Sequence, residues 1–378
     1  MLGKLNQVFF PHDDKSYHFK YLDGLRGFAV LIVMLSHSSN YAFYFLGMNF
    51  SGTGKSGVYL FFILSSYLLD RQIALGFVKK KLSVAFWLNY FFRRFLRIYP
   101  LFVIALVLNL GIFTFLGLDY SMSIKGGREF LRHLFLLEGK SVFWSIPVEF
   151  KYYFLSPLIM LILFYVLRWK KTLVYPFLIL LIVVSLYVMK SFSLGEVSTL
   201  RYLAFFIAGT ILAVIEIRNH DRLLLLPSST KKILTALSIL ALLAYFFLVP
   251  SFHFALKNIE TYNHHVFSRS KYYLHFVVIW STLLFCIKYG EKLLWRVFEM
   301  KWLRFFGSIS FSMYLFHLLA LKLVNSYIMP NPKNMIDATL GFCIFVGISV
   351  VVSSATYYFI EYPLSKLRLQ KRIENNIA

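Results

Sequence analysis

The apolar residues of this chain fall into blocks of roughly 18 to 25 residues, and this block length is the feature that most restricts the fold. A helix needs about 20 apolar residues to cross the hydrocarbon core of a bilayer, because it rises about 1.5 Å per residue. With 59% hydrophobic and 15% charged residues, the chain is predicted to be an all-α integral membrane protein. Ten spans are predicted, at residues 22–43, 57–76, 96–118, 146–167, 172–190, 199–217, 232–250, 272–288, 306–327 and 337–360.

The segments between these blocks offer no second domain. We find no soluble domain, long linker, low-complexity tract or internal repeat in them. A single transmembrane domain is therefore expected over residues 1–378, folded as one helical bundle with short tails at 1–20 and 364–378. Residues 1–20 are charged and lack the apolar core and cleavage site of a signal peptide, so the first span is expected to stay in place.

The net charge of +23 is spread over the loops between the apolar blocks instead of forming one stripe, so no nucleic-acid partner is expected. If the N-terminus is cytoplasmic, the inside segments hold 26 Lys and Arg residues and the outside loops hold 10. The positive-inside rule then predicts that both termini are cytoplasmic. The clearest inside loop is predicted at residues 70–98.

Few side chains suggest a metal site. Cys286 and Cys343 lie within apolar blocks, and two cysteines are too few for a disulfide framework or a four-ligand zinc site. A predicted outer loop holds further metal-binding residue types whose spacing matches no strong ligand pattern, namely His253, Glu260, His264 and His265. We expect no metal ion and no permanently bound cofactor.

The stretch SGTGKSG at residues 51–57 is similar to a phosphate-binding P-loop. That motif needs a glycine where Asn49 stands, and no strand precedes the stretch. The predicted topology also puts it outside, away from cytosolic nucleotides. We therefore discount it as a nucleotide site.

The first predicted span carries two ionisable residues, Arg26 and His37. They are eleven residues apart, about 16 Å along a helix, with Arg26 near the predicted inner surface. Serines at 36, 38 and 39, followed by Asn40, suit a wet cavity around His37 better than a lipid-facing surface. A neutral imidazole there can accept a proton, as a general base must. The alternative is helix packing for His37 and snorkelling of Arg26 to the interface.

The other charged groups near the ends of the predicted spans fall on either the inner or the outer face of the membrane in the predicted topology. The run FFRRFLRIYP at residues 91–100 and Glu361 lie near the inner face, whereas FWSIPVEFKYY at 143–153 and Arg201 lie near the outer face. Guanidinium groups at an inner mouth suit a phosphorylated cytosolic donor, although positive-inside anchoring explains a basic run equally well. Glu149 is expected to be functional, because an unpaired charge inside a span costs on the order of 3 kcal/mol.

Seven stretches, in order along the chain, resemble motifs of the acyltransferase 3 family of membrane O-acyltransferases. They are LDGLRGFAVLIVMLSH, GVYLFFILSSYLL, RRFLRIYP, FWSIPVEFKYYFLSP, RYLAFFIAG, FFGSISFSMYLFH and YYFIEYP. One departure lies in SSYLL at 65–69, where the family usually has glycine at the position of Ser66 and phenylalanine at that of Tyr67. The departure puts close helix packing there in question.

The resemblance implies transfer of an acyl group, commonly acetyl, from cytosolic acyl-CoA to a sugar hydroxyl. The implied partners are acyl-CoA on the inner side, a glycan or glycolipid such as lipopolysaccharide or peptidoglycan on the outer side, and the lipid bilayer of a bacterial inner membrane. Some members carry an extra extracytoplasmic hydrolase-like domain. This chain is expected to be the stand-alone transmembrane form.

The resemblance also implies roles for individual residues. Arg26 and His37 match the family's essential pair, Arg94 and Arg97 its third-span arginines, and Glu361 its acidic residue before proline. The expected catalytic residues are Arg26, His37, Glu149 and Glu361. The expected donor-binding residues are Arg26, Arg93, Arg94 and Arg97. The expected acceptor-binding residues are Trp144, Ser145, Tyr153, Arg201, Ser310, Tyr314 and His317.

The hypothesis leaves two choices open. His37 either deprotonates the sugar hydroxyl for direct attack or takes the acyl group transiently. Glu149 or Glu361 either orients an imidazole or balances the arginines, while Ser310 and Tyr314 are expected to donate to the developing oxyanion.

The rival class is a multi-span transporter or flippase, because spans with intramembrane charges also describe carriers. Carriers usually show paired halves or helices broken at matching places, and we find no such internal symmetry in the sequence. The series of motifs therefore favours an enzyme.

Overall fold

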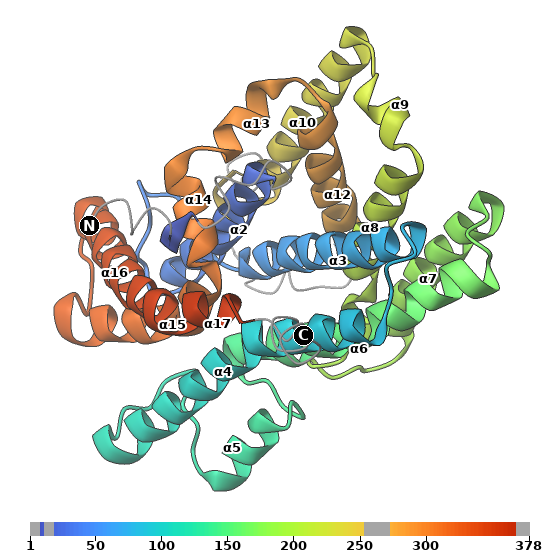
Figure 1. Ribbon diagram of the computed structural model, residues 1–378. Helices are drawn as coiled ribbons and strands as arrows, with labels where there is room; N and C mark the ends of the chain where they lie inside the picture. The colour runs from blue at the N-terminus through green and yellow to red at the C-terminus, as the bar shows by residue number, and fades with distance from the viewer. Residues whose placement is uncertain (1–7, 11–18, 253–272, 368–378) are drawn as a thin grey trace.

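A computed structural model of the chain describes residues 8–10, 19–252 and 273–367. Within these ranges the chain is helical and forms no β-strand, which confirms the predicted all-α class (Figure 1). The group His253, Glu260, His264 and His265, and most of the two predicted tails, lie outside the described residues.

Each of the ten predicted spans corresponds to a helix. These helices are α2 (Lys20–Ser39), α3 (Gly54–Val78), α4 (Val84–Leu116), α6 (Ser145–Leu161), α7 (Lys171–Ser191), α8 (Thr199–Arg218), α10 (Ser228–Leu248), α12 (Tyr273–Tyr289), α15 (Ser310–Leu323) and α16 (Met335–Thr356). Shorter segments join or extend them: α5 (Gly127–Leu134), α9 (His220–Leu224), α13 (Lys292–Phe298), α14 (Lys301–Ser308) and α17 (Tyr362–Ser365), the 3₁₀ segment η1 (Ser141–Trp144), and the π-helical segments η2 (Ile162–Val166), η5 (Val324–Ile328) and η6 (Tyr357–Glu361).

Among the described residues, eight helical segments are long and apolar enough to cross a membrane, or nine if α12 and α13, which meet at a bend of 108°, count as one. The remaining predicted span is α2, which is less apolar because it carries Asp23, Arg26 and His37. Its neighbours α3 and α14 lie beside it in the middle of the bundle (Figure 1). The charged residues of α2 are therefore surrounded by protein.

The structure corrects the predicted inside loop at residues 70–98. Only residues 79–83 lie between α3 and α4. The side chain of Ser83 accepts a hydrogen bond from the backbone N–H of Phe86 and caps α4, which then continues through the basic run and past Pro100. At 33 residues, α4 is about 50 Å long, well beyond the hydrocarbon thickness of about 30 Å, so its basic start need not lie in lipid.

Helices α2 and α14 approach each other closely at two glycines. A Cβ atom added to Gly27 would overlap the carbonyl oxygen of Leu303, and one added to Gly307 would overlap that of Asp23. Small residues allow such backbone contact between membrane helices. This contact fixes the segment of α2 that carries Arg26.

The close helix packing that Ser66 put in question is present, because a glycine on the neighbouring helix leaves space for the serine. A Cβ atom on Gly209 of α8 would overlap the Ser66 hydroxyl, so the two helices touch at this point. Tyr67, the other departure, donates its hydroxyl proton to Glu216 of α8. Both unusual residues therefore join α3 to α8.

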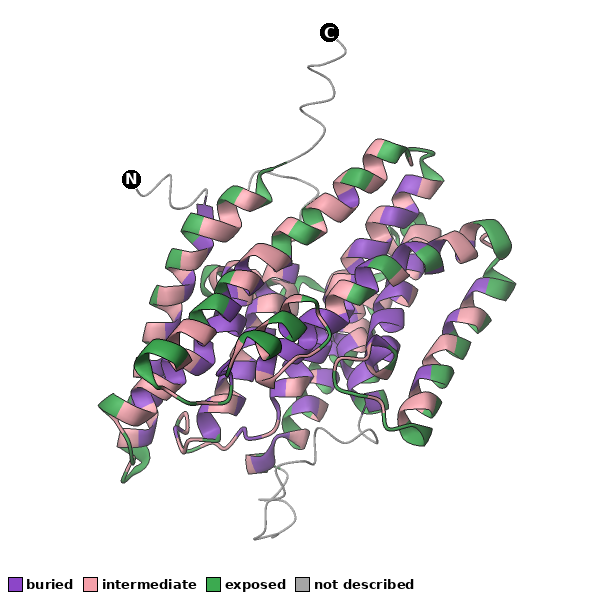
Figure 2. Ribbon diagram, turned by 90° about the horizontal axis from the view of Figure 1, so that it is seen from below, coloured by how far each residue is buried: buried purple, intermediate pink, exposed green. Residues whose placement is uncertain are grey.

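Contacts between helix ends define two faces of the bundle. Glu216 forms ion pairs with Arg71 at 2.7 Å and with Lys288 at 2.6 Å, so the last turns of α3, α8 and α12 meet at what we call the Glu216 side. Lys55, in the first turn of α3, pairs with Glu196 at 3.0 Å, and we call this the Lys55 side. In the predicted topology, the helix ends that meet on the Glu216 side share one face of the membrane, and those that meet on the Lys55 side share the other. Exposed apolar side chains are frequent on α7 and α10, which suits contact with lipid. Figure 2 shows exposed residues along the outer helices and buried residues in the middle of the bundle.

Candidate active site

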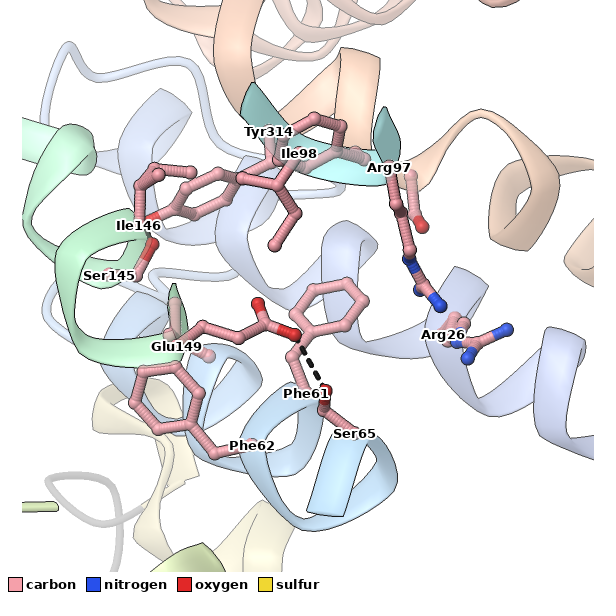
Figure 3. Close-up of a pocket in the computed structure, with 13 residues that line it drawn as sticks. Arg26, Phe61, Phe62, Ser65, Arg97, Ile98, Ser145, Ile146, Glu149 and Tyr314 are labelled. Carbon is pink, nitrogen blue, oxygen red and sulfur yellow. Dashed lines mark hydrogen bonds between the residues drawn. The ribbon is translucent and has the colours of Figure 1, made fainter. Parts of the chain in front are cut away.

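The first cavity, which we call the arginine cavity, lies between α2, α3, α4, α6 and α15 and holds about 60 Å³ of free space (Figure 3). Apolar side chains such as Phe61 and Phe62 form part of the wall. The polar lining consists of Arg26, Ser65, Arg97, Ser145, Glu149, Ser310 and Tyr314.

Charges of both signs face this cavity. Figure 3 shows the guanidinium groups of Arg26 and Arg97 on one side and the Glu149 carboxylate opposite. Glu149 accepts hydrogen bonds from Ser65 at 2.6 Å and from the Tyr153 hydroxyl at 2.8 Å. Arg26 forms a loose ion pair with Asp23 at 3.4 Å. The carboxylates thus offset part of the positive charge of the two arginines.

The second cavity, which we call the histidine cavity, lies beside the first, is partly open to solvent and holds about 420 Å³ of free space. Lys55 lies 5.6 Å from the centroid of the Trp144 ring, within the range of a cation–π contact. Arg201 donates to the carbonyl oxygen of Leu194 at 3.2 Å. The polar and aromatic lining consists of Ser36, His37, Asn40, Lys55, Ser141, Trp144, Glu196, Arg201 and Tyr314.

The two cavities meet at Val58 and Tyr314, which line both. The histidine cavity lies toward the Lys55 side, since Lys55 and Glu196 belong to its wall. The start of α2 lies toward the Glu216 side, where the ring of the preceding residue, Phe19, contacts Lys288 at 4.2 Å. Arg26 and His37 therefore lie at different depths of one helix and face different cavities.

The start of α3 comes close to His37. A Cβ atom added to Gly54 would lie 3.7 Å from Nε2 of His37 and 3.2 Å from the Ser36 hydroxyl. On the other side, the His317 ring lies 5.1 Å from the His37 ring, centroid to centroid. The other serines near His37 do not serve the cavity, because Ser38 and Ser39 donate to the carbonyl oxygen of Leu35 at 3.1 and 2.8 Å.

Glu149 and Tyr153, which were predicted near the outer face, lie at and behind the arginine cavity. Glu149 lines the arginine cavity. Tyr153 lies behind Glu149 and donates a hydrogen bond to it, and the centroid of the Tyr153 ring lies 5.8 Å from the guanidinium carbon of Arg94. Helix α6 begins at Ser145 on the cavity wall, so Glu149 and Tyr153 lie about 6 and 12 Å further along it. The predicted span 146–167 gave the start of this helix to within one residue, but the motif did not show that Glu149 faces Arg26 and Arg97.

Several predicted site residues line neither cavity. Arg94 donates to Gln72 at 3.4 Å, and Glu361, within the π-helical segment η6, accepts a hydrogen bond from Ser312. Among the described residues neither Glu149 nor Glu361 forms an ion pair with His37 or with an arginine. Glu149 shares the arginine cavity with Arg26 and Arg97, which suits the role of balancing the arginines. The remaining predicted residues outside both cavities are Arg93, Tyr153 and His317.

The predicted oxyanion donors are already engaged. The Tyr314 hydroxyl donates to the carbonyl oxygen of Val142 at 2.6 Å and accepts from Ser145 at 2.9 Å. Ser310 donates to the carbonyl oxygen of Gly307 at 2.8 Å. The arrangement therefore does not support a role for these two hydroxyl protons in the cavity.

Sequence reasoning missed three charged residues. Lys55 and Glu196 line the histidine cavity; Lys55 belongs to the stretch that we discounted as a P-loop. Asp70 is fully buried and accepts hydrogen bonds from Tyr152 at 2.8 Å, from Thr210 at 2.5 Å and from Ser156. The sequence did offer one signal for Asp70, namely a carboxylate near the end of the predicted span 57–76.

Comparison with known proteins decides the family. The family model described as an acyltransferase domain matches residues 19–358, nearly the whole described chain. The chain belongs to this acyltransferase family. This result confirms the resemblance drawn from the seven motifs, and it supports an enzyme that transfers acyl groups.

Curated relatives of this acyltransferase are O-acetyltransferases. The O-acetyltransferase OatA of Staphylococcus aureus (strain NCTC 8325 / PS 47) is 24% identical over 383 residues, covering 94% of this chain and 59% of the relative. The peptidoglycan O-acetyltransferase OatA of Listeria monocytogenes serovar 1/2a is 25% identical over 385 residues, covering 91% of this chain and 55% of the relative. The chain thus spans less than two thirds of the length of these relatives. No solved structure matches it significantly.

Proposed function

We propose that this chain is a membrane O-acetyltransferase of a bacterial cytoplasmic membrane, moving an acetyl group from cytosolic acetyl-CoA to a sugar hydroxyl of an exported or cell-surface glycan. The observation that carries the proposal is that the two cavities meet at Val58 and Tyr314. Two substrates that remain on opposite sides of a membrane can then reach one reaction centre. The names of the OatA relatives support acetyl as the transferred group and peptidoglycan as one class of acceptor.

The donor binds from the Glu216 side, which faces the cytoplasm with both chain termini. The excess of Lys and Arg in the segments predicted inside supports this orientation. The phosphates of the donor pair with Arg26 and Arg97, because planar guanidinium groups bind phosphate oxygens bidentately. Arg94 adds positive charge behind this wall. Glu149 and Glu361 offset the arginines when the donor is absent.

The acceptor binds in the histidine cavity from the Lys55 side. The Trp144 ring offers an apolar face to a sugar ring, while Asn40, Arg201 and Glu196 offer hydrogen-bonding groups. Charged and amide groups of this kind fix the orientation of a polyhydroxylated ligand. The ion pair between Lys55 and Glu196 lies at the partly exposed edge of the cavity, so Lys55 can bind the ligand as well as Glu196.

His37 performs the proton transfer between the two cavities. Its Nε2 takes the proton of the sugar hydroxyl as the hydroxyl oxygen attacks the thioester carbon. The carbon–sulfur bond then breaks, and the leaving thiolate receives the proton from His37. In the alternative route the acetyl group first moves to the imidazole, and a mass increase of one acetyl group on His37 in the absence of acceptor would identify it.

Purified protein in lipid nanodiscs, supplied with radiolabelled acetyl-CoA and a soluble peptidoglycan fragment, tests this function. We expect labelled glycan and released CoA from the natural protein and none from His37→Ala. Size-exclusion behaviour and thermal unfolding of the variant should match the natural protein. Counterflow of intact glycan across vesicles without loss of the thioester would instead support the transporter.

A further inference from the structure

His317 is a fully buried residue whose two ring nitrogens have different surroundings. Its Nδ1 lies 3.0 Å from the carbonyl oxygen of Met313 and 2.9 Å from that of Tyr314. Because a carbonyl oxygen only accepts hydrogen bonds, Nδ1 must carry a proton and donate. In the neutral ring Nε2 is then a bare acceptor, and it is buried with no hydrogen-bond partner among the described residues.

A buried acceptor without a partner destabilises the fold, so its presence calls for a physical reason. The neighbouring polar ring is that of His37, whose centroid lies 5.1 Å away at an interplanar angle of 52°. His37 lines the histidine cavity, whereas His317 lines neither cavity. His317 thus lies behind His37 as seen from the substrates.

The two nitrogens of His37 face different partners. Nε2 lies on the side of Gly54, which itself lines the histidine cavity. This placement assigns Nε2 to the substrate and leaves Nδ1 for the protein. A general base usually needs an acceptor at its second nitrogen, which fixes the tautomer and stabilises the cation that forms. No described carboxylate forms an ion pair with His37.

We propose that His317 is the positioning residue for His37: its unprotonated Nε2 accepts a hydrogen bond from Nδ1–H of His37 during acyl transfer. This proposal rests on the proposed function and adds a second histidine to its mechanism. As Nε2 of His37 takes the hydroxyl proton, the positive charge that develops on the ring is shared through Nδ1–H with His317. The proton returns to the leaving thiolate, so neither histidine changes its protonation state over the full reaction.

The kinetic test compares two substitutions of similar volume. His317→Leu fills the space but offers no acceptor, whereas His317→Gln can donate an amide N–H to the backbone and accept at its side-chain oxygen. We expect His317→Leu to lower kcat at least about tenfold, with KM for acetyl-CoA and acceptor unchanged, because the lost group acts on the base and not on binding. His317→Gln should recover most of the lost rate. Leu318→Ala, a packing change at the adjacent residue of α15, should keep kcat within about twofold.

Equal losses of kcat in His317→Leu and His317→Gln, or a rise in KM without loss of kcat, would reduce His317 to a packing residue. A second measurement remains decisive if these variants fold poorly. In the natural protein labelled with ¹⁵N-histidine, the His317 signals should show protonated Nδ1 and unprotonated Nε2. A protonated Nε2 would overturn the proposal. This spectrum needs no catalysis, so it separates failure of the histidine pair from failure of the proposed function.

Discussion

Val58 of α3 and Tyr314 of α15 border both the arginine cavity and the histidine cavity. The two cavities therefore adjoin at these side chains, and a route that joins them has to pass between Val58 and Tyr314. Tyr314 is held in place by hydrogen bonds to Val142 and Ser145, so the width of the route depends on a fixed ring.

A large side chain at Val58 should close this route. We expect Val58→Trp to abolish acetyl transfer while acetyl-CoA still binds, since Arg26 and Arg97 are unchanged. Val58→Ala, which removes volume, should keep most of the activity at a modest cost in stability. Isothermal titration with CoA, measured beside the transfer rate, checks this expectation. Full activity in a folded Val58→Trp variant would show that the substrates meet elsewhere.

Arg97 and Arg93 lie one turn apart on α4, but only Arg97 lines the cavity. A charged hydrogen bond contributes about 1.5–3 kcal/mol, so we expect Arg97→Gln to raise KM for the donor at least about tenfold. Arg93→Gln, the matched control, should change it less than about threefold. The same rise in KM for both variants would favour general attraction of the basic run over a specific donor contact.

The close contact of α2 with α14 should tolerate no side chain at Gly27. Gly27→Ala places a Cβ atom onto the carbonyl oxygen of Leu303, and overpacking of this kind costs about 1–3 kcal/mol. The expected result is a lower thermal unfolding midpoint in nanodiscs. Gly347→Ala is the control, because a Cβ atom there meets nothing within 4 Å. Equal midpoints for both variants would contradict the described packing.

Asp70 should contribute to stability and not to substrate binding. It ties α3 to α6 and α8 through the hydroxyls of Tyr152, Ser156 and Thr210. Asp70→Ala leaves three buried hydroxyls without their acceptor, and each loss typically costs about 1–3 kcal/mol. Asp70→Asn keeps one oxygen and should be less harmful. Unfolding midpoints in the order natural, Asn, Ala are expected; a change in KM with unchanged midpoints would instead indicate a role in binding.

The helices were predictable because the length of an apolar block directly reflects the thickness of a bilayer. The polar ends of these helices were harder to predict, since a helix can continue beyond its apolar block through charged residues, as α4 does through Arg93 and Arg94. The distance between Arg26 and His37 along the helix was predictable from the rise per residue alone. The placement of Glu149 opposite Arg26 and Arg97 was not, because it depends on how α6 packs against α2 and α4.

Lys55 and Asp70 show what a single sequence hides. Lys55 was discounted because its local pattern failed the P-loop test, yet its role depends on Trp144 and Glu196, which are distant in sequence. Asp70 was overlooked although it lies in the predicted span 57–76, because its three hydroxyl partners come from two other helices. Contacts between distant segments, and not local motifs, determine both environments.

The central claim is that donor and acceptor reach His37 from opposite sides of the membrane. Sealed vesicles of uniform protein orientation, with radiolabelled acetyl-CoA on one side and the glycan fragment on the other, test it most directly, with His37→Ala vesicles as the blank. We predict labelled glycan only when acetyl-CoA is on the Glu216 side and the glycan is on the Lys55 side. Product formation that requires both substrates on one side, or the reverse arrangement, would contradict the account.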